Sequence, residues 1–457
     1  MQRYINNENI AAAEKIARSV SEAGGRVYYV GGFVRDTIRN TDNKDIDIEV
    51  HGINPDVLEK ILCEVGQPKL MGASFGIYGL SGCELDISLP RAVCAEGRGG
   101  KSDFLECVDP YVGEEEAAKR RDFTINALMQ DVLNGEILDF FGGKEDLKNG
   151  IIRHTNTETF CEDPLRVVRA AQFAARFAFQ VCPETLSLCR SINISEVAHE
   201  RVYEELKKVL LKSSQPSVFF EVLRSMGQLD VWFPEVSALI DVQQPPAFHP
   251  EGDVWNHTMI VLDIGASLRE KAENPLGFML SLLCHDFGKA VTTTNEDGRI
   301  RSIGHEIAGT DIASAFIKRL TSDNNLRRYI LNMTELHMRP NIIADQHSGS
   351  KAFCRLFDAS ICPEDLLLVS EADFLGCAKN EGYDSKKKYL YDMLELFNER
   401  MKQPYVTGKD LLQKGCMPGK EMGQALEYAH KLRLAGVCKK QALCQTLSYI
   451  RSIKSTE

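Results

Sequence analysis

The most constraining feature of this chain is the point at which its hydrophobic pattern changes period. Three short runs ahead of residue 100 have strand character: RVYYV, DIDIEV at Asp45–Val50 and CELDISL at Cys83–Leu89. Residues 8–24 have helical spacing, and after about residue 160 almost every segment does. We therefore predict an α+β fold, in which a small mixed α/β domain precedes a chain that is nearly all helical.

The length of the chain predicts several domains. Domains most often hold about 100–150 residues, and this chain has 457. The proline-rich stretch QQPP at Gln243–Pro246 indicates a joint, and the glycine-rich stretch AEGRGGKSDF at residues 95–104 indicates a mobile loop. We expect four parts, comprising residues 1–150, 151–230, 231–380 and 381–457.

Bulk properties exclude some classes of protein. The N-terminus does not have the pattern of a secretory signal and no apolar run is long enough to cross a bilayer, so we expect a cytoplasmic protein with no membrane partner. The 14 cysteines form no CxxC pair, which favours reduced thiols over a zinc ribbon. A net charge of −11 restricts any RNA contact to local basic runs, namely Lys207–Lys212, Lys386–Lys388 and Lys431–Lys440. Each run alone is more typical of a solvated helix face.

The strongest local signal is the motif GGFVRDTIRNTDNKDIDIE, which begins at Gly31. Asp45 and Asp47 are two apart on a predicted strand, so both carboxylates lie on one face. Like charges so close repel unless a cation joins them, and hard ions such as Mg²⁺ prefer oxygen ligands. Gly31 and Gly32 would let backbone amides approach a triphosphate. A DxD pair or a double glycine alone is common, but their combination predicts metal-dependent nucleotidyl transfer.

Two arginine motifs follow, RRDFTINAL at Arg120–Leu128 and EDPLRVVRAAQFAARF at Glu162–Phe177. Adjacent arginines can contact phosphate or base edges. The alternative is an N-capped helix start with Asp122 or Thr124 as the cap, and both interpretations can hold together. Asp163, Arg166 and Arg169 follow at three-residue steps and share a predicted helix face. Acceptors on Asp163 and donors on Arg166 could match the edge of a base, and the alternative is a surface salt bridge.

These motifs occur in an order that resembles a known family. GGxVRD, the DxD strand, RRDFTINAL, the DxxGG stretch at Asp139–Gly143, EDPLRVVRA and HERVYEELKKVL follow one another along the chain. The chain is similar to the class II nucleotidyltransferases of the DNA polymerase β superfamily, specifically to bacterial CCA-adding enzymes that carry an HD domain. The resemblance spans roughly residues 27–450 and implies a nucleotidyltransferase head, a helical neck, an HD domain and a helical tail.

The resemblance also implies roles for matching residues. Asp45 and Asp47 would hold Mg²⁺ as the catalytic pair, and tRNA, CTP and ATP would be the substrates. The positions implied for nucleotide binding are Gly32, Arg35, Arg121, Asp163, Arg166 and Arg169, of which Asp163 and Arg166 would read C or A. A third arginine usually follows, where this chain has Gln172, and we expect arginine there to be tolerated. A third metal carboxylate is left open between Glu84 and Asp86.

The second half of the chain carries an ordered series of histidines and aspartates. The series comprises His257, His285, Asp286, His305, His337 and Asp373. Imidazoles and carboxylates of this kind can converge on one or two divalent ions, and Lys289 could hold a phosphate. The set resembles the HD phosphohydrolase superfamily, which implies a second activity on phosphate esters such as 2′,3′-cyclic phosphates. Mixed N and O ligands favour Ni²⁺, Mn²⁺ or Co²⁺.

Several alternative functions stay open at this point. A bacterial poly(A) polymerase has the same head, but CELDISLPR and NALMQD differ from its usual stretches. An enzyme that adds only CC or only A is a second alternative. A catalytically dead RNA-binding protein is disfavoured by the intact Asp45–Asp47 pair, and a primary hydrolase with a vestigial head by the intact head motifs.

Overall fold

The computed structural model describes residues 7–41, 45–72, 76–94, 105–377 and 383–454. The loop predicted at residues 95–104 therefore lies outside the described residues. The chain divides into two compact units, one of residues 1–197 with 222–228 and the other of residues 198–221 with 229–457. No described helix is both long and apolar enough to cross a membrane.

The first unit is built on a mixed sheet whose strand order is β3-β4-β5-β2-β1-β8-β9. Its strands are β1 (Arg26–Val30), β2 (Ile46–His51), β3 (Pro68–Gly72), β4 (Ile77–Leu80), β5 (Leu85–Ser88), β8 (Met129–Asp131) and β9 (Ile137–Leu138). β2 and β5 are parallel, whereas the other neighbouring pairs are antiparallel. A separate hairpin joins β6 (Arg91–Cys94) to β7 (Leu105–Val108). All three strands predicted from the sequence are confirmed to within two residues.

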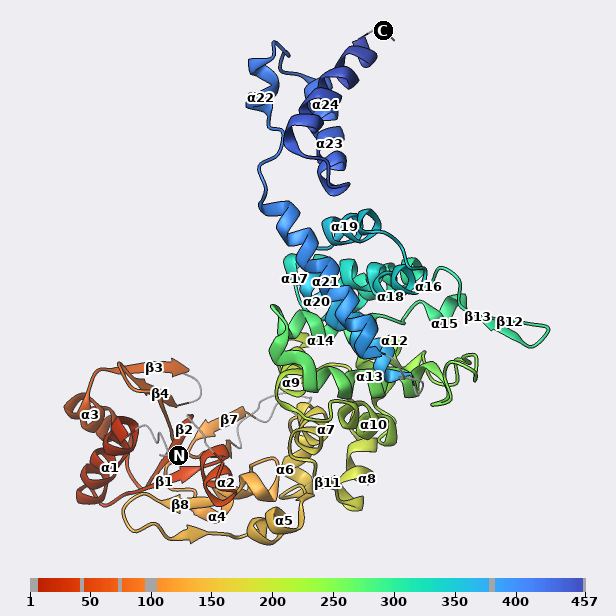
Figure 1. Ribbon diagram of the computed structural model, residues 1–457. Helices are drawn as coiled ribbons and strands as arrows, with labels where there is room; N and C mark the ends of the chain where they lie inside the picture. Colours follow the sequence, from red (N-terminus) through yellow and green to blue (C-terminus); the bar gives the residue numbers. More distant parts are fainter. Residues whose placement is uncertain (1–6, 42–44, 73–75, 95–104, 378–382, 455–457) are drawn as a thin grey trace. The chain divides into compact units, whose positions relative to one another are not determined.

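The helices of this unit are drawn in red to yellow in Figure 1. They are α1 (Asn7–Glu22), α2 (Gly32–Ile38), α3 (Pro55–Val65), α4 (Glu114–Lys119), η1 (Thr124–Asn126), α5 (Gly143–Asn149), α6 (Thr157–Cys161), α7 (Leu165–Phe177) and α8 (Pro183–Ser191). Among them, α1, α2 and α3 contact the sheet. Apolar residues of α1 and α3 pack with Ile46, Ile48 and Val50 of β2 in one core. Since strand side chains alternate, Asp47 and Glu49 face the opposite side of the sheet.

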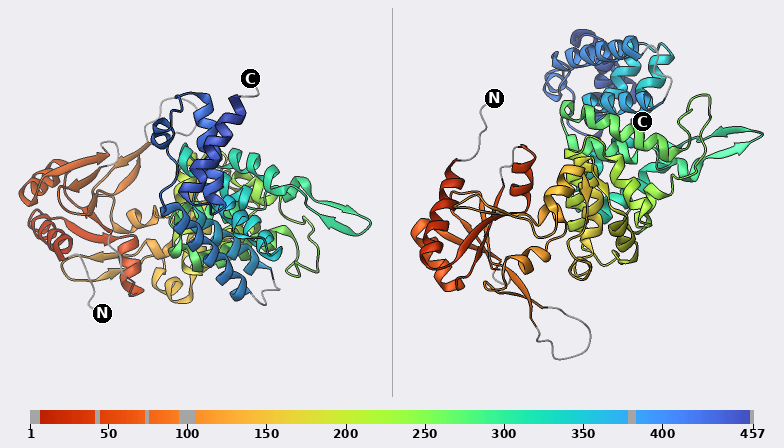
Figure 2. Two further views of the ribbon diagram at one scale, coloured as in Figure 1. Left: turned by 45° about the horizontal axis from the view of Figure 1, so that its top comes forward. Right: turned by 90° about the horizontal axis from the view of Figure 1, so that it is seen from below.

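The second unit is helical, apart from one hairpin (Figures 1 and 2). Its helices are α9 (His199–Lys212), α11 (Leu229–Trp232), α12 (Pro234–Ser237), α13 (Val254–Leu268), η2 (Arg269–Lys271), α14 (Pro275–Cys284), α15 (Lys289–Thr292), α16 (His305–Leu320), α17 (Asn324–Leu336), α18 (Arg339–Asp345), α19 (Ser350–Ala359), α20 (Pro363–Gly376) and α21 (Tyr383–Lys402). α10 (Ser217–Ser225) crosses from the residues of this unit to those of the first. Three further helices, α22 (Gly408–Gln413), α23 (Lys420–Leu434) and α24 (Lys439–Lys454), have a core of their own.

The sequence predicts a chain that is nearly all helical after about residue 160, and two short pairs of strands depart from this prediction. β10 (Ile151–Ile152) pairs with β11 (Gln180–Val181), and β12 (Thr294–Glu296) forms a hairpin with β13 (Arg299–Arg301). The hairpin is exposed and polar and therefore has no apolar alternation in its sequence. The stretch Gln243–Pro246 lies inside the second unit, not at the division between the units. The α+β class predicted from the sequence is confirmed.

Candidate nucleotidyl-transfer and metal sites

The DxD pair lies at the start of β2 beside a third carboxylate. Asp45 is exposed and directly precedes the strand, whereas Asp47 is half-buried within it. Asp86 of β5 is the register partner of Asp47, and parallel neighbours in register present their side chains on the same face. Burial raises the pKa of Asp47. The negative charges of Asp86 and Asp45 raise this pKa further, whereas the positive charge of Arg121 lowers it. Such a cluster of negative charge favours a bound cation.

Of the two residues left open as a third carboxylate, Asp86 has the position for it. Glu84 precedes β5, and its main-chain N–H and C=O are hydrogen bonded to the side chain of Asn9. That contact ties the main chain of Glu84 to α1. Asp86 is in register with Asp47 and raises the pKa of Asp47 through its charge, so we favour Asp86 as the third carboxylate.

The glycine turn, the second motif and the DxD strand meet at one point. Gly31 has a φ of 64° and caps α2, which begins at Gly32. A Cβ atom at Gly31 would lie 3.4 Å from Arg121 Nη1 and 3.7 Å from Asp47 Oδ2. Arg121 Nη2 donates to Glu49 Oε2 at 2.9 Å, which fixes the guanidinium there. Two motifs, one with Gly31 and Asp47 and the other with Arg121, thus come together at one position.

Arg35 occupies a different environment from the one the sequence predicts. Its side chain is buried, with two donors on the carboxylate of Asp36 and Nη1 on Asn126 Oδ1 at 2.6 Å. The guanidinium also lies 4.6 Å from the ring centroid of Phe177. In this structure Arg35 ties α2 to the RRDFTINAL motif and to α7, and it is not presented to a ligand.

Asp163 and the arginines of α7 do not lie on a single helix, because α7 begins at Leu165. Asp163 precedes it and accepts a hydrogen bond from Leu165 N–H at 3.1 Å. Arg166 donates to the carbonyls of Thr159 and Arg120, at 2.6 and 2.5 Å. Arg169 makes two hydrogen bonds to Asp122 Oδ2, at 2.8 and 2.6 Å.

Gln172 follows on the same helix but is only 1% exposed. Its Nε2 is buried and has no hydrogen-bond partner within the described part of the chain. An arginine here would carry its charge into the protein interior. The burial of Gln172 therefore argues against the expectation that arginine is tolerated.

Three polar residues that the sequence reasoning missed support the predicted ones. Glu49 holds Arg121, and its other oxygen is 2.9 Å from His51 Nε2. Asp122 accepts from Arg169 and from Asn126, and Asn126 in turn accepts from Arg35. Burial raises the pKa of Asp122, but Arg169 and Asn126 outweigh it and hold the pKa below its ordinary value. Glu49 continues the alternation of Asp45 and Asp47, which is the signal that could have identified it.

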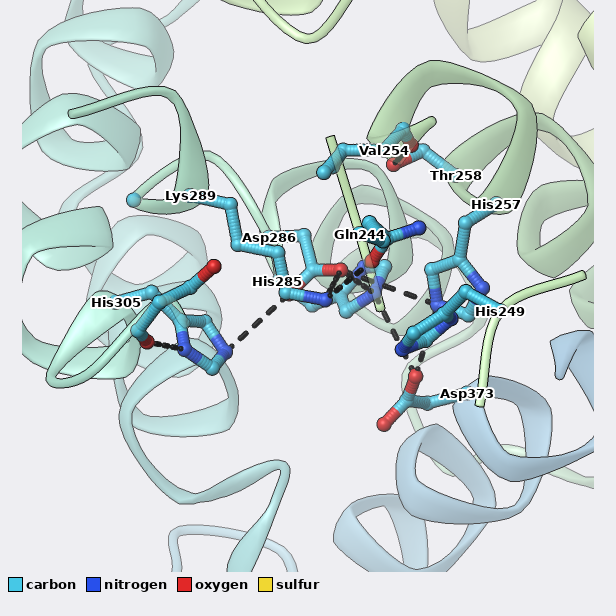
Figure 3. A network of polar contacts seen from close by, with 12 residues as sticks. Gln244, His249, Val254, His257, Thr258, His285, Asp286, Lys289, His305 and Asp373 are labelled. Carbon is cyan, nitrogen blue, oxygen red and sulfur yellow. Dashed lines mark hydrogen bonds and ion pairs between the residues drawn. The ribbon is translucent and has the colours of Figure 1, made fainter. Parts of the chain in front are cut away.

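The histidines and aspartates of the HD series converge in the second unit, as Figure 3 shows for most of them. His257 lies in α13, His285 and His337 follow the ends of α14 and α17, His305 begins α16, and Asp373 lies in α20. Asp286 is at their centre. Its oxygens lie 3.2 Å from His285 Nε2 and 3.3 Å from His305 Nε2.

The four imidazoles are oriented alike. The Nδ1 atoms of His285, His305 and His337 lie 2.6–2.8 Å from main-chain carbonyls, and that of His257 lies 3.0 Å from Glu251 Oε1. Carbonyl and carboxylate oxygens can only accept, so each Nδ1 carries a proton and Nε2 is the nitrogen on the side of the carboxylates. Nε2 of His257 is hydrogen bonded to Asp373 Oδ1 at 3.0 Å.

These residues form two groups of three possible ligands. His257, His285 and Asp373 make one triad, and Asp286, His305 and His337 make the other; within each triad the ligand atoms lie within 4.8 Å of one another. The Nε2 atoms of His285, His305 and His337 and both oxygens of Asp286 are buried without a hydrogen bond inside the described regions. Asp286 Oδ2 is nevertheless ion-paired with Lys289 Nζ. Nitrogen and oxygen ligand atoms in this arrangement fit divalent ions.

A lysine and a glycine lie next to Asp286 and His305 in this cluster. Lys289 Nζ lies 2.7 Å from Asp286 Oδ2 and donates to Gln244 Oε1 at 2.9 Å. A Cβ atom at Gly288 would lie 2.0 Å from the carbonyl oxygen of His305, so only glycine permits this approach of α15 to α16. Burial lowers the pKa of His337 to about 4, which keeps its imidazole neutral at pH 7.

Several lysines of the basic runs are paired with carboxylates. Lys207 and Lys208 contact Glu204 and Glu205, and the three lysines from residue 386 contact Asp345, Glu371 and Asp392. Lys439 contacts Asp410. These contacts support the interpretation of the runs as ordinary helix faces.

Two family models and several curated proteins match this chain. The model "Poly A polymerase head domain" matches residues 27–153, and "Probable RNA and SrmB- binding site of polymerase A" matches residues 178–240. The chain is 37% identical over 363 residues to the multifunctional CCA protein of Actinobacillus pleuropneumoniae serotype 5b, covering 77% of this chain and 85% of that protein. It is 34% identical over 436 residues to that of Cupriavidus metallidurans, covering 92% and 100%.

Solved structures share the fold. The CCA-adding enzyme of Bacillus stearothermophilus in complex with CTP has a TM-score of 0.68 at 19% identity and covers 100% of both chains. The CCA-adding enzyme of Thermotoga maritima complexed with tRNA has a TM-score of 0.64 at 20% identity and covers 98% of this chain and 96% of that one. At these identities the likeness concerns the fold alone.

Proposed function

Since the chain belongs to the family of the multifunctional CCA proteins, we propose that it builds or repairs the 3′-terminal CCA of tRNA from CTP and ATP. The observation that carries the proposal is the convergence of Asp47, Gly31 and Arg121. Carboxylates that can hold a metal, an open glycine turn and a fixed guanidinium are the parts that nucleotidyl transfer requires.

Each head residue has a defined task in this proposal. Asp45 and Asp47 hold Mg²⁺, with Asp86 as a third carboxylate. Mg²⁺ bound there supplies a Lewis acid for the attacking 3′-hydroxyl and the leaving pyrophosphate. The glycine turn at Gly31–Gly32 offers main-chain N–H groups to the triphosphate. Glu49 keeps Arg121 beside that turn, so that its charge meets the phosphates without reorganisation.

Base choice is assigned to the residues at the start of α7. Asp163 offers acceptors and Arg166 offers donors, which together can match the hydrogen-bonding edge of C or A. Arg169 assists Asp163 and Arg166 in binding the base. Asp122 accepts two hydrogen bonds from Arg169 and so holds its guanidinium in one place. Arg35 stabilises the site from behind through Asn126. We assign this arginine a positioning role.

The proposed reaction belongs to the cytoplasm, where tRNA is matured. Because many lysines of the basic runs are already paired, tRNA would be held by local patches through its shape, with an affinity that falls as salt is added. A poly(A) polymerase and an enzyme limited to CC or to A remain the alternative outcomes of the assay.

Measuring nucleotide incorporation by two head variants tests the catalytic assignment. We expect Asp45→Asn and Asp47→Asn each to abolish addition to tRNA while thermal unfolding stays unchanged, because a neutral amide is a poor Mg²⁺ ligand. Asp56→Asn, at an exposed aspartate of α3, is the matched control and should incorporate normally. Near-normal incorporation by either DxD variant would remove the pair from the mechanism.

We also propose a metal-dependent phosphohydrolase activity for the HD series. The orientation of four imidazoles toward Asp286 and Asp373 favours it, with Ni²⁺, Mn²⁺ or Co²⁺ in the two triads. Such an ion lowers the pKa of a bound water and supplies hydroxide near neutral pH. Lys289 is placed to contact a phosphate beside Asp286. Removal of a 2′,3′-cyclic phosphate would free the 3′-hydroxyl that the head requires.

A single substitution separates the two activities. We expect Asp286→Ala to eliminate hydrolysis of a 2′,3′-cyclic phosphate with every divalent metal, because Asp286 contacts ligands of both triads. CCA addition to an intact tRNA should persist, because the head uses none of these residues. If the unmodified protein hydrolyses nothing with any metal, the HD series has no hydrolytic role.

A further inference from the structure

A third group of ligand-type side chains lies on the Nδ1 side of His257. His249 Nδ1 and His257 Nδ1 lie 2.8 and 3.0 Å from Glu251 Oε1, and Cys377 Sγ lies 3.8 Å from His249 Nδ1. One ligand atom from each of the four lies within 4.8 Å of the others. In Figure 3, His249 lies beside His257 at the end of the network away from His305. The group is distinct from the HD triads, which use the Nε2 side of His257.

The hydrogen bonds within this group leave one oxygen of Glu251 without a partner in the described part of the chain. The Glu251 side chain is 5% exposed, and its Oε2 has no hydrogen-bond partner within the described ranges. A buried carboxylate oxygen without a partner is costly, and a cation would satisfy it.

We propose that His249, Glu251 and Cys377 form a metal site of their own that takes a divalent ion of zinc type. One imidazole, one carboxylate and one thiolate are a ligand set that such borderline-soft ions accept. Tetrahedral bonds of the usual lengths separate ligand atoms by roughly 3.3–3.8 Å. The 3.8 Å between His249 Nδ1 and Cys377 Sγ lies at the end of that range. The 2.8 Å between His249 Nδ1 and Glu251 Oε1 is the length of a hydrogen bond, which the ion would replace.

The three ligands come from two parts of the second unit. His249 and Glu251 lie on the segment that leads into α13, and Cys377 directly follows α20. Glu251 would give Oε2 to the new site while Oε1 keeps the N–H of His257. The carboxylate would then link the new site to the triad that contains His257.

Protons balance when the ion binds. In the absence of a cation the Cys377 thiol donates to the main-chain carbonyl of Asp373 at 3.6 Å, so it is protonated. Binding replaces the S–H bond by a metal–sulfur bond and releases one proton to the buffer, with no change of oxidation state. His249 Nδ1 faces Glu251 Oε1 and therefore carries the imidazole N–H. When Nδ1 binds the ion, this proton moves to Nε2 through solvent and the imidazole stays neutral.

Cobalt spectroscopy of the full-length protein tests this site selectively. Metal-free protein is titrated with Co²⁺, and a thiolate-to-cobalt charge-transfer band in the near ultraviolet is followed. The HD triads contain no sulfur, so only a thiolate site produces this band. We expect it in the unmodified protein, and we expect Zn²⁺ to bleach it while Mg²⁺ does not. A band that Mg²⁺ bleaches equally, or no band at saturating Co²⁺, would overturn the proposal.

Three variants assign the band to residues. Cys377→Ser should lose it and bind one metal equivalent fewer, whereas Cys362→Ser, at the other end of α20, should keep it. Asp286→Ala should also keep it, which separates this site from the proposed hydrolase. Unchanged tRNA nucleotide addition and thermal unfolding establish that Cys377→Ser is folded. A band that persists in Cys377→Ser would refute the assignment.

Discussion

Replacing Gln172 by arginine or by methionine should have opposite consequences. The side chain is 1% exposed and its Nε2 has no hydrogen-bond partner among the described residues. Arginine would leave an uncompensated buried charge, which costs about 3–5 kcal/mol. Methionine has nearly the same shape and removes an unsatisfied amide, whose burial costs about 1–3 kcal/mol. We therefore expect Gln172→Arg to be strongly destabilising and Gln172→Met to be neutral or mildly stabilising.

Thermal unfolding and nucleotide addition, measured on the same preparations, distinguish burial from nucleotide reading. At about 2–4 °C per kcal/mol for a domain of this size, the melting temperature of Gln172→Arg should fall by about 6–20 °C. Gln172→Met should melt at or above the unmodified protein and keep the same preference for CTP and ATP. The reasoning fails if arginine leaves the melting temperature unchanged, or if methionine alters base choice without altering stability.

Two further predictions concern residues around the nucleotide. Glu49→Gln should raise the KM for CTP and ATP alike by about tenfold, because the charge-assisted hydrogen bond that positions Arg121 is weakened. Glu22→Gln on α1 is the control, and an effect on one nucleotide alone would contradict the positioning role of Glu49. Asp163→Asn should keep the hydrogen bond to Leu165 N–H but blur discrimination against UTP and GTP by about 1–3 kcal/mol, measured as the ratio of kcat/KM values. Unchanged selectivity at a lower rate would make Asp163 structural.

Local patterns explain which features could be predicted from the sequence. Strand alternation identifies β2 and places Asp45 and Asp47 on one face, because side chains alternate within a few residues. The HD series was recognisable because it supplies several metal-ligand types in a known order. The hairpin of β12 and β13 was missed, although Asp297–Gly298 is a turn signal and both residues have positive φ.

Long-range contacts account for most of what the sequence did not predict. No short sequence pattern indicates that Gln172 is buried. Arg166 and Arg169, on the same helix, instead form hydrogen bonds to residues outside that helix. Gln244 reaches Lys289 only because the chain folds back across 45 residues. Cys377 comes close to His249 for the same reason, at a separation of 128 residues. Such pairs depend on tertiary packing, which no short pattern encodes.

The central claim is CCA addition, and sequencing the 3′ ends of reaction products tests it most directly. The purified protein is incubated with tRNA that ends before CC, after CC and after CCA, with CTP and ATP supplied separately and together. The account predicts that CTP alone extends the first substrate by CC, that ATP alone adds one A to the second, that both nucleotides complete CCA on the first, and that the third is left unextended. Runs of A on every substrate, or extension that stops after CC with both nucleotides present, would contradict it.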